Sequence, residues 1–291
     1  MKRPNLFLMA SPRAGSTQLA NWLASHPDIT LSSIKEPNHF SAHEFDPAYV
    51  SNTHLNDVDP ASYVQNKKRK QAQFAVFRDR NDYESLFEGM QTRWRMEAST
   101  SYLSCPQAPE LIHEYAPDAR IIILTRDPVK RAISHYRLAC RTGRTRATLM
   151  QELKAEIAGI TPLDGQFLLR PSQTQNALHL IKSHFTLSQC LFLKFEEMVS
   201  NQKQTMHQIA DWLDIDASGF DLNVKAQNAS VAPRFAAINA YLEKIGAKSK
   251  LRRRLPSFIK PWLKKIWFDP KQEIQVTNAE ILALKTALRQ V

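Results

Sequence analysis

The stretch LFLMASPRAGSTQLANWLASHPDI, residues 6–29, decides the fold class. Its apolar run ends in a short loop that holds Arg13 and Gly15, and Ser16 then begins a segment with the apolar spacing of a helix. A glycine-containing turn between a buried strand and a helix presents backbone N–H groups, and the helix N-terminus adds about half a positive charge. The stretch therefore predicts a strand, an anion-binding loop and a helix. An ordinary turn capped by Ser16 or Thr17 is the alternative that the loop alone leaves open.

The loop departs from the nucleoside-triphosphate pattern G-x-x-x-x-G-K-[ST] at two positions. Ala10 stands in place of the first glycine, and Ser16 stands in place of the lysine. An arginine, Arg13, lies three residues before the missing lysine. The loop therefore raises the question of which anion an arginine in this place would bind.

Alternating strands and helices follow along the chain. The segment RIIILT, residues 120–125, is the clearest interior strand, and Pro128 stands at the first turn of the helix after it. Residues 46–93 are polar and predict short helices and loops over the sheet. Further strands are expected at residues 6–10, 29–34 and 190–194, and helices at residues 17–25, 174–185 and 205–213. This order predicts an α/β protein with a central, mainly parallel sheet in a three-layer α/β/α fold with helical additions.

The composition indicates a globular protein with a basic surface. The chain has 291 residues, of which 43% are hydrophobic, and can therefore bury a core as one large domain or as one domain with a cap. Lysine and arginine number 39 against 28 acidic residues, a formal net charge of +11. Such a surface attracts nucleotides, acidic glycans, nucleic acid or anionic lipid, and the charge alone does not choose among them.

Cysteine usage and hydropathy bear on the cellular compartment. The three cysteines, Cys105, Cys140 and Cys190, show no metal-type spacing, which favours a reducing compartment and predicts no structural zinc. The first strand begins close to Met1, and no apolar run reaches the roughly 18 residues of a membrane span. We therefore expect a cytoplasmic protein, free in solution or peripheral to a membrane.

A second anion-binding element lies in TRDPVKRAISHYRL, residues 125–138. Arg126 leaves the carboxyl end of a central strand, where open α/β sheets bind ligands, and Ser134 lies eight residues farther along the following helix. With both elements, the chain resembles the sulfotransferases that use 3′-phosphoadenosine 5′-phosphosulfate (PAPS), in their bacterial and carbohydrate branch. ASPRAGST, residues 10–17, is similar to the family's 5′-phosphosulfate loop, and RDPVKRAISHY, residues 126–136, is similar to its 3′-phosphate element.

Four further segments extend the resemblance over residues 5–265. They are KEPNHF at residues 35–40, EASTSYL at 97–103, LFLKFEEM at 191–198, and QNASVAPR at 227–234, which is similar to a nucleotide-closing loop. The resemblance implies a P-loop-like fold and a single sulfotransferase domain over residues 1–291. Within it, residues 5–215 would form the α/β core, and residues 216–291 the closing loop and a basic helical part.

The resemblance also implies the reaction and its donor site. A sulfuryl group would pass in line from PAPS to a hydroxyl oxygen, less often to an amine, without a metal ion or a covalent enzyme intermediate. Arg13 would meet the bridging and leaving oxygens, where charge builds as the sulfur–oxygen bond breaks. The residues implied around the donor are Arg13, Ala14, Gly15, Ser16 and Thr17 at its 5′ end, Arg126 and Ser134 at its 3′-phosphate, and Arg234 in the closing loop.

Glu36 is the candidate general base, by its place in KEPNHF and because a carboxylate near cationic groups stays ionised at neutral pH. His39 is the second candidate for the base. From the residues alone, Glu36 could instead pair with Lys35 or cap a turn, and His39 could be a structural histidine. Lys35, Glu97 and Tyr102 are the residues expected at the acceptor.

The acceptor and two rival functions stay open in the sequence. KEPNHF favours a carbohydrate over other hydroxyl compounds, and nucleic acid is not an expected partner. The segment LRRRLPSFIKPWLKKIWF, residues 251–268, interleaves bases with aromatics, which suits either a peripheral membrane contact or a packed basic subdomain. A P-loop nucleotide kinase is disfavoured because Ser16 occupies the lysine position. A non-catalytic basic nucleotide- or anion-binding protein would not explain two phosphate elements.

Overall fold

The computed structural model describes residues 3–47, 58–66, 69–162, 165–224 and 274–290, together with the backbone of residues 232–233 and 268–269. The chain divides into two compact units. The first comprises Met1–Glu44, Asp57–Asp127 and Gln173–Ala226, and the second comprises Phe45–Asn56, Pro128–Ser172 and Gln227–Val291. The single sulfotransferase domain expected over residues 1–291 stays a prediction.

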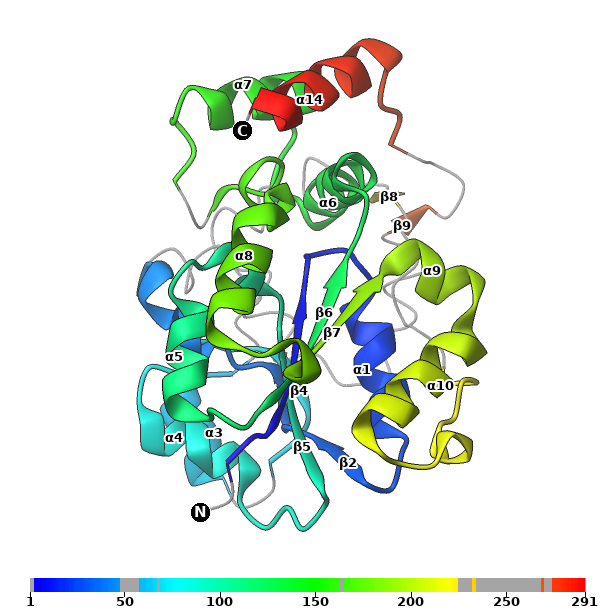
Figure 1. Ribbon diagram of the computed structural model, residues 1–291. Coiled ribbons are helices and arrows are strands. Elements are labelled where there is room, and N and C mark those ends of the chain that lie inside the picture. The colour runs from blue at the N-terminus through cyan, green and yellow to red at the C-terminus, as the bar shows by residue number, and fades with distance from the viewer. Residues whose placement is uncertain are drawn as a thin grey trace. The chain divides into compact units, whose positions relative to one another are not determined.

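The first unit is built on a five-stranded parallel sheet in the order β2-β5-β1-β6-β7 (Figure 1). Its strands are β1 (Leu6–Ala10), β2 (Ile29–Leu31), β5 (Trp94–Ser99), β6 (Arg120–Thr125) and β7 (Cys190–Lys194). Strand β1 lies at the centre and is buried along its whole length. The strands expected at residues 6–10, 120–125 and 190–194 are confirmed, as is the mainly parallel sheet.

Helices cover both faces of this sheet, because the side chains of each strand alternate between two apolar clusters. The main helices of the unit are α1 (Ser16–Ala24), α5 (Ala108–Tyr115), α8 (Thr174–His184), α9 (Phe195–Ser200) and α10 (Gln202–Leu213). Phe7 and Met9 of β1 pack into the cluster that α5 and α8 share. Leu6 and Leu8 face the other cluster, with α1 and α10. Figure 1 shows these helix pairs on opposite sides of the sheet, so the three-layer α/β fold is confirmed in this unit.

The parallel register brings three strand ends to one edge of the sheet. Ala10 of β1 lies beside Leu124 of β6, and Met9 lies beside Ser99 of β5. The segments that follow these strands therefore leave from the same edge. This is the edge at which open α/β sheets bind ligands.

The strand expected at residues 29–34 is two strands in two different sheets. Strand β2 ends at Leu31, and β3 (Ile34–Glu36) pairs in parallel with β4 (Ala72–Phe74). Between them, the Ser32 amide still donates to the Met96 carbonyl of β5, at 2.9 Å, while the Ser32 hydroxyl donates to the Ile34 carbonyl. The chain thus leaves the main sheet at Ser32.

Two strands of the first unit, β4 and β5, were not expected from the sequence. Strand β4 lies within residues 46–93, where only helices and loops were expected, so that prediction is wrong for this segment. The short helices α3 (Pro60–Gln65) and α4 (Arg80–Glu84) do form there. Strand β5 is the second omission, although it pairs directly with the central strand β1.

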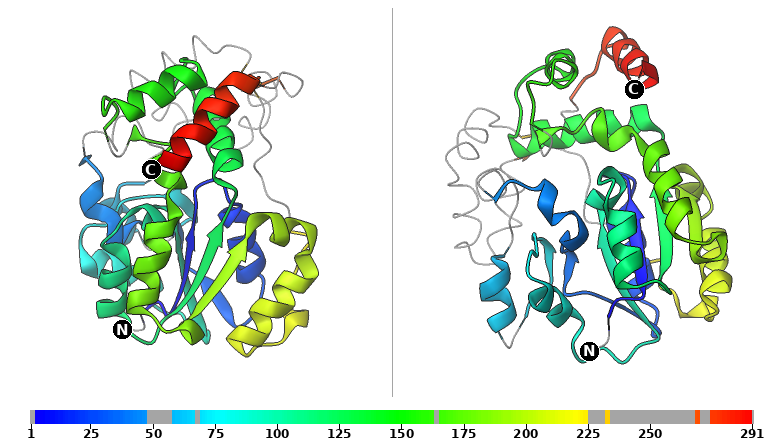
Figure 2. Two further views of the ribbon diagram at one scale, coloured as in Figure 1. Left: turned by 45° about the horizontal axis from the view of Figure 1, so that its top comes forward. Right: turned by 60° about the vertical axis from the view of Figure 1, so that its left-hand side comes forward.

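The second unit contains α6 (Pro128–Thr142), α7 (Leu149–Ile157) and α14 (Asn278–Gln290), and β8 (Ala232–Pro233) pairs antiparallel with β9 (Phe268–Asp269). Pro128 begins α6, as expected. Helix α14 packs against α6 and α7 (Figure 2), and Leu284 is buried in their shared apolar cluster. Among the helices that the structure describes, none is both long enough and apolar enough to cross a bilayer.

Two buried charged side chains order the segment 167–169 of this unit. Arg131 Nη2 donates to the carbonyl oxygens of Phe167 and Leu168, at 2.6 and 2.9 Å. The Glu156 carboxylate accepts the amides of Phe167, Leu168 and Leu169, at 2.7, 2.9 and 2.8 Å. The Arg131 side chain is fully buried, so this arginine of RDPVKRAISHY is a structural anchor.

Candidate functional site

The loop between β1 and α1 has the backbone of an anion-binding turn. Arg13 and Gly15 both adopt left-handed conformations, with φ of 71° and 83°. Gly15 is the N-cap of α1 and no side chain caps the helix, so the capped-turn alternative lacks its defining hydrogen bond. The first N–H groups of a helix have no intrahelical acceptor, and here they follow directly on the loop.

A side chain at Gly15 would crowd its neighbours as well as strain the backbone. A Cβ added at this position would lie 3.0 Å from Met198 Cε and 3.0 Å from two ring carbons of Phe195. Both side chains belong to α9, which follows β7. The loop is therefore packed tightly against the neighbouring strand–helix connection.

Arg126 reaches this loop from the end of β6. Its Nη1 donates to the Arg13 carbonyl at 2.6 Å, and its guanidinium carbon lies 4.3 Å from the Phe195 ring centroid. Burial lowers the pKa of Arg126, while the charges of Glu196 and Asp127 act in the opposite direction. Two buried polar atoms here, Arg126 Nε and Ser11 Oγ, have no hydrogen-bond partner among the described residues. Such atoms suit an anion with further acceptor oxygens.

Glu36 lies in a polar cluster that reaches the start of α1. Lys35 Nζ lies 2.8 Å from Glu36 Oε1 and donates to Ser16 Oγ at 3.3 Å. Gln73 Nε2 donates to the same carboxylate oxygen at 3.2 Å, and Thr100 Oγ1 donates to Glu36 Oε2 at 3.0 Å. The structure therefore brings Ser16, Lys35 and Glu36 together. No sequence pattern pointed to Gln73, and Thr100 was visible only as part of EASTSYL.

His39 has the contacts of a structural histidine. Its Nδ1 lies 2.9 Å from the Phe77 carbonyl, and its ring stacks on Tyr83 with centroids 4.3 Å apart and planes 9° apart. Burial lowers the pKa of His39. The preceding residue, Asn38, is fully buried with φ of 52°, and its side-chain amide donates to the carbonyls of Glu36 and Ala75. These contacts favour Glu36 over His39 as the base, and both assignments stay predictions.

Glu97 is the centre of a buried hydrogen-bond network. Its Oε2 accepts the hydroxyls of Tyr83 and Tyr102, at 3.0 and 2.9 Å, and its Oε1 accepts the Ser99 hydroxyl at 2.6 Å. Burial raises the pKa of Glu97 to about 7, although the three hydroxyl donors oppose the shift. Because Glu97 and Tyr102 are fully buried, direct contact of either with an acceptor is disfavoured.

We expect Glu97 to make the stability of the fold depend on pH. A carboxyl whose folded-state pKa is raised stabilises the fold below its unfolded pKa, and this contribution is lost as pH rises through about 7. The free energy of unfolding should therefore fall by on the order of 2–3 kcal/mol between pH 5 and pH 8. Urea unfolding of the protein and of Glu97→Gln over this range measures it. Equal falls in both proteins would show that Glu97 does not titrate there.

The remaining candidate residues lie apart from this cluster. Ser134 is a partly exposed residue of α6 in the second unit, while Arg126 belongs to the first unit. Their assignment as joint 3′-phosphate ligands therefore rests only on the sequence RDPVKRAISHY and stays a prediction. Arg234 and residues 251–267 lie outside the described residues, as does the side chain of Phe268. The closing loop and the basic aromatic segment therefore stay predictions.

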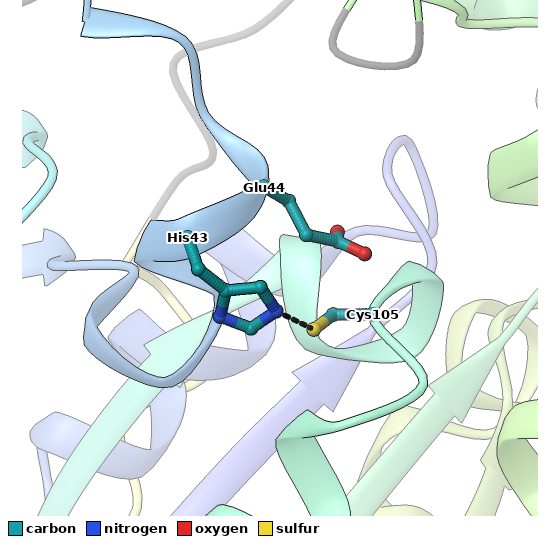
Figure 3. Close-up of side chains that lie close together, drawn as sticks. All are labelled: His43, Glu44 and Cys105. Atoms are coloured by element: carbon teal, nitrogen blue, oxygen red, sulfur yellow. Dashed lines mark hydrogen bonds between the residues drawn. The ribbon is translucent and has the colours of Figure 1, made fainter.

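Another group of polar side chains contains His43, Glu44 and Cys105 (Figure 3). The potential ligand atoms of these residues lie within 4.8 Å of one another. Cys105 Sγ lies 3.6 Å from His43 Nε2, a sulfur hydrogen bond, and only Cys105 of the three is buried. The hydrogen bond accounts for the approach of thiol and imidazole, so the group does not by itself indicate a metal site. The expectation that no metal ion is needed stays a prediction.

Sequence relatives of the chain are sulfotransferases. Human carbohydrate sulfotransferase 15 is 24% identical over 246 residues, which cover 73% of this chain and 44% of that protein. Human heparan sulfate glucosamine 3-O-sulfotransferase 6 is 27% identical over 186 residues, 59% of this chain and 53% of that protein. The chain thus spans about half the length of these relatives.

Solved structures share the fold. A sulfotransferase from Alicyclobacillus acidocaldarius superposes with a TM-score of 0.61 at 23% identity, covering 91% of this chain and 95% of that one. Retinol dehydratase in complex with androsterone and inactive cofactor PAP gives a TM-score of 0.50 at 12% identity, covering 100% of this chain and 81% of that one. A family model described as "Sulfotransferase family" matches residues 4–219, which include β1 to α10 of the first unit and the loop of Arg13 and Gly15. The chain belongs to the sulfotransferase family.

Proposed function

We propose that the protein transfers a sulfuryl group from PAPS to an acceptor hydroxyl. The observation that carries the proposal is the β1–α1 loop, in which the left-handed Arg13 and Gly15 precede an uncapped helix N-terminus. Lys35 and Glu36 lie beside its first helical residue, Ser16. A phosphosulfate needs such donors at its 5′ end, and an adjacent carboxylate can take the acceptor proton.

The donor would be held by two groups of residues. Arg13 and the backbone N–H groups of residues 14–17 would bind the 5′-phosphosulfate. The Ser11 hydroxyl, which has no hydrogen-bond partner in the described part of the chain, suits a further acceptor oxygen there. Arg126 and Ser134 would bind the 3′-phosphate, and Arg234 would act from the closing loop. The PAP named in the retinol dehydratase complex supports a nucleotide of this kind.

The reaction would be a direct displacement at sulfur. An acceptor oxygen forms a bond to sulfur while the bond from sulfur to the 5′-phosphate oxygen breaks, and 3′-phosphoadenosine 5′-phosphate leaves with that electron pair. Glu36 takes the acceptor proton, because its carboxylate shares the Lys35 ammonium with Ser16, the first residue of α1. Arg13 offsets the charge that grows on the leaving oxygen. No step requires a metal ion.

A carbohydrate is the acceptor class that the relatives favour. Both human relatives carry a carbohydrate or a heparan sulfate glucosamine in their names. The net charge of +11 suits an acidic saccharide, although part of it serves the nucleotide. Other hydroxyl compounds, and after them amines, are the competing acceptor classes that an acceptor screen with PAPS separates.

The activity is tested by offering the protein two labelled donors. Transfer of radioactive sulfate from PAPS to a panel of glycans, lipids, phenols and amines is expected, with and without EDTA. Transfer of radioactive phosphate from ATP, dependent on magnesium, would instead support the kinase alternative. Binding without any transfer across the panel would support a non-catalytic nucleotide-binding protein.

We expect the product nucleotide to stabilise the fold more than its analogue without a 3′-phosphate. A charge-assisted hydrogen bond is worth about 1.5–3 kcal/mol, and Arg126 and Ser134 would make such bonds to the 3′-phosphate. Thermal unfolding with 3′-phosphoadenosine 5′-phosphate or with adenosine 5′-phosphate, at equal concentrations, measures the difference. Equal shifts from the two nucleotides would remove Arg126 and Ser134 from the donor site.

A further inference from the structure

We infer that Lys35 binds the 5′-phosphosulfate, as the lysine that the loop itself lacks. The inference deepens the proposed function, on which it rests. In the triphosphate-binding pattern the lysine stands where this chain has Ser16. Lys35 Nζ lies 3.3 Å from the hydroxyl of that same residue. A lysine from strand β3 therefore brings its ammonium to the first residue of α1, where the loop has none.

The burial of Lys35 indicates that its ammonium has a defined task. The side chain is 6% exposed, and a buried ammonium is costly unless it is paired and hydrogen-bonded. Glu36 Oε1 supplies the counter-charge at 2.8 Å, and Ser16 Oγ accepts a second hydrogen bond. An ammonium has three donors in a compact head, which suits the oxygens of a phosphosulfate.

The contact with Ser16 assigns Lys35 to the donor and not to the acceptor. The sequence places Lys35 with the acceptor residues, next to Glu36. In the structure its ammonium bridges Glu36 to the donor loop. Lys35 from β3 and Arg13 from the loop would then both bring a positive charge to the 5′ end of the donor. The same ammonium orients the carboxylate that we propose as the base.

The rival explanation is that Lys35 only neutralises Glu36. The two explanations differ in what happens to the affinity for a 5′-phosphate group. A partner of Glu36 alone would leave that affinity unchanged, whereas a donor ligand would lose one charge-assisted hydrogen bond to it. The comparison needs two nucleotides that differ only in the 5′-phosphate: 3′-phosphoadenosine 5′-phosphate and adenosine 3′-phosphate.

The experiment measures dissociation constants of both nucleotides by calorimetry at one salt concentration. Lys35→Met, which keeps most of the stem but removes the charge, should weaken 3′-phosphoadenosine 5′-phosphate by about 10- to 100-fold. Adenosine 3′-phosphate should be affected less than threefold. Lys203→Met, at an exposed position of α10, is the matched control for the loss of one positive charge and should change neither constant.

Lys35→Met leaves Glu36 without its counter-charge, which endangers folding. The double variant Lys35→Met/Glu36→Gln removes both charges and should show the same selective loss of 5′-phosphate affinity. Lys35→Arg keeps the positive charge and should retain most of the 5′-phosphate affinity. Circular dichroism checks that each variant is folded.

The outcomes separate this inference from the proposed function. If the unaltered protein binds 3′-phosphoadenosine 5′-phosphate and the folded double variant binds it equally well, Lys35 is not a donor ligand, while the proposed function stands. Adenosine 5′-diphosphate is measured as a third nucleotide. If the protein binds it more tightly than 3′-phosphoadenosine 5′-phosphate, and the double variant loses this tighter binding, Lys35 binds the 5′-phosphate but the sulfotransferase proposal fails. If neither nucleotide binds the unaltered protein, both proposals fail.

Discussion

Glu36→Gln is expected to lower kcat by about 10²–10⁴ and to leave the affinity for the donor nucleotide nearly unchanged. Glutamine keeps the shape of the side chain. Its carbonyl oxygen can still accept from Lys35 and Gln73, and its amide can donate to Thr100, whose hydroxyl can turn from donor to acceptor. The substitution therefore removes the base while most of its hydrogen bonds remain. Single-turnover rates with a confirmed acceptor, together with calorimetric nucleotide binding, measure both quantities.

Two further variants test whether the loss in Glu36→Gln comes from removing the base. Thr100→Val removes a hydrogen bond that orients Glu36 but leaves the carboxylate, so we expect a loss of only about tenfold. His39→Ala removes the second candidate base, which the structure holds between Phe77 and Tyr83. Near-normal rates in Glu36→Gln with a large loss in His39→Ala would identify His39 as the base and contradict our assignment.

The sequence predicts the strands whose side chains are apolar on both faces. LFLMA and RIIILT are buried along most of their length, and their hydropathy alone marks them as interior strands. Strand β5, WRMEAS, also lies inside the sheet, between β2 and β1, but carries Arg95 and Glu97. The charge of Glu97 hides its burial, which depends on a hydroxyl from Tyr83, a residue outside the strand. No local pattern can reveal such a partner.

The change of sheet at Ser32 is a non-local event of the same kind. The sequence predicts one strand over residues 29–34, ITLSSI, across two serines. Strand β3 leaves the main sheet because it pairs with β4, in which Ala72 lies beside Ile34. The choice between extending β2 and starting β3 therefore depends on residues far along the chain, and the polar character of residues 46–93 conceals the strand among them.

In the candidate site, too, features that depend on a local motif were predicted, and features that depend on distant residues were not. The glycine loop and Arg126 were predicted, because each depends on a motif next to a strong strand. Adjacent charges also suggested the Lys35–Glu36 pair. The contact of Lys35 with Ser16 was not predictable, since it depends on how β3 lies against the start of α1. The left-handed Asn38 likewise directs His39 toward Phe77, although KEPNHF alone places His39 beside the base.

Arg13→Ala is expected to lower kcat/KM for PAPS by about 10³–10⁴, because the Arg13 charge would meet the phosphosulfate in both the ground state and the transition state. The left-handed φ of 71° complicates this substitution, since alanine is strained there and glycine is not. Arg13→Gly is therefore the cleaner removal of the side chain. Arg13→Lys keeps a charge without the bidentate geometry and should recover part of the activity.

These three variants also keep the anchor of Arg126, because Arg126 donates to the backbone carbonyl of residue 13 rather than to its side chain. Affinity for adenosine 3′-phosphate should therefore stay within about threefold in all of them, while kcat/KM falls. A loss in Arg13→Ala that Arg13→Gly does not share would trace the effect to backbone strain. If Arg13→Gly keeps kcat/KM near normal, Arg13 is not the cation at the leaving oxygen. Lys35 is then left as the cation that we propose at the 5′-phosphosulfate.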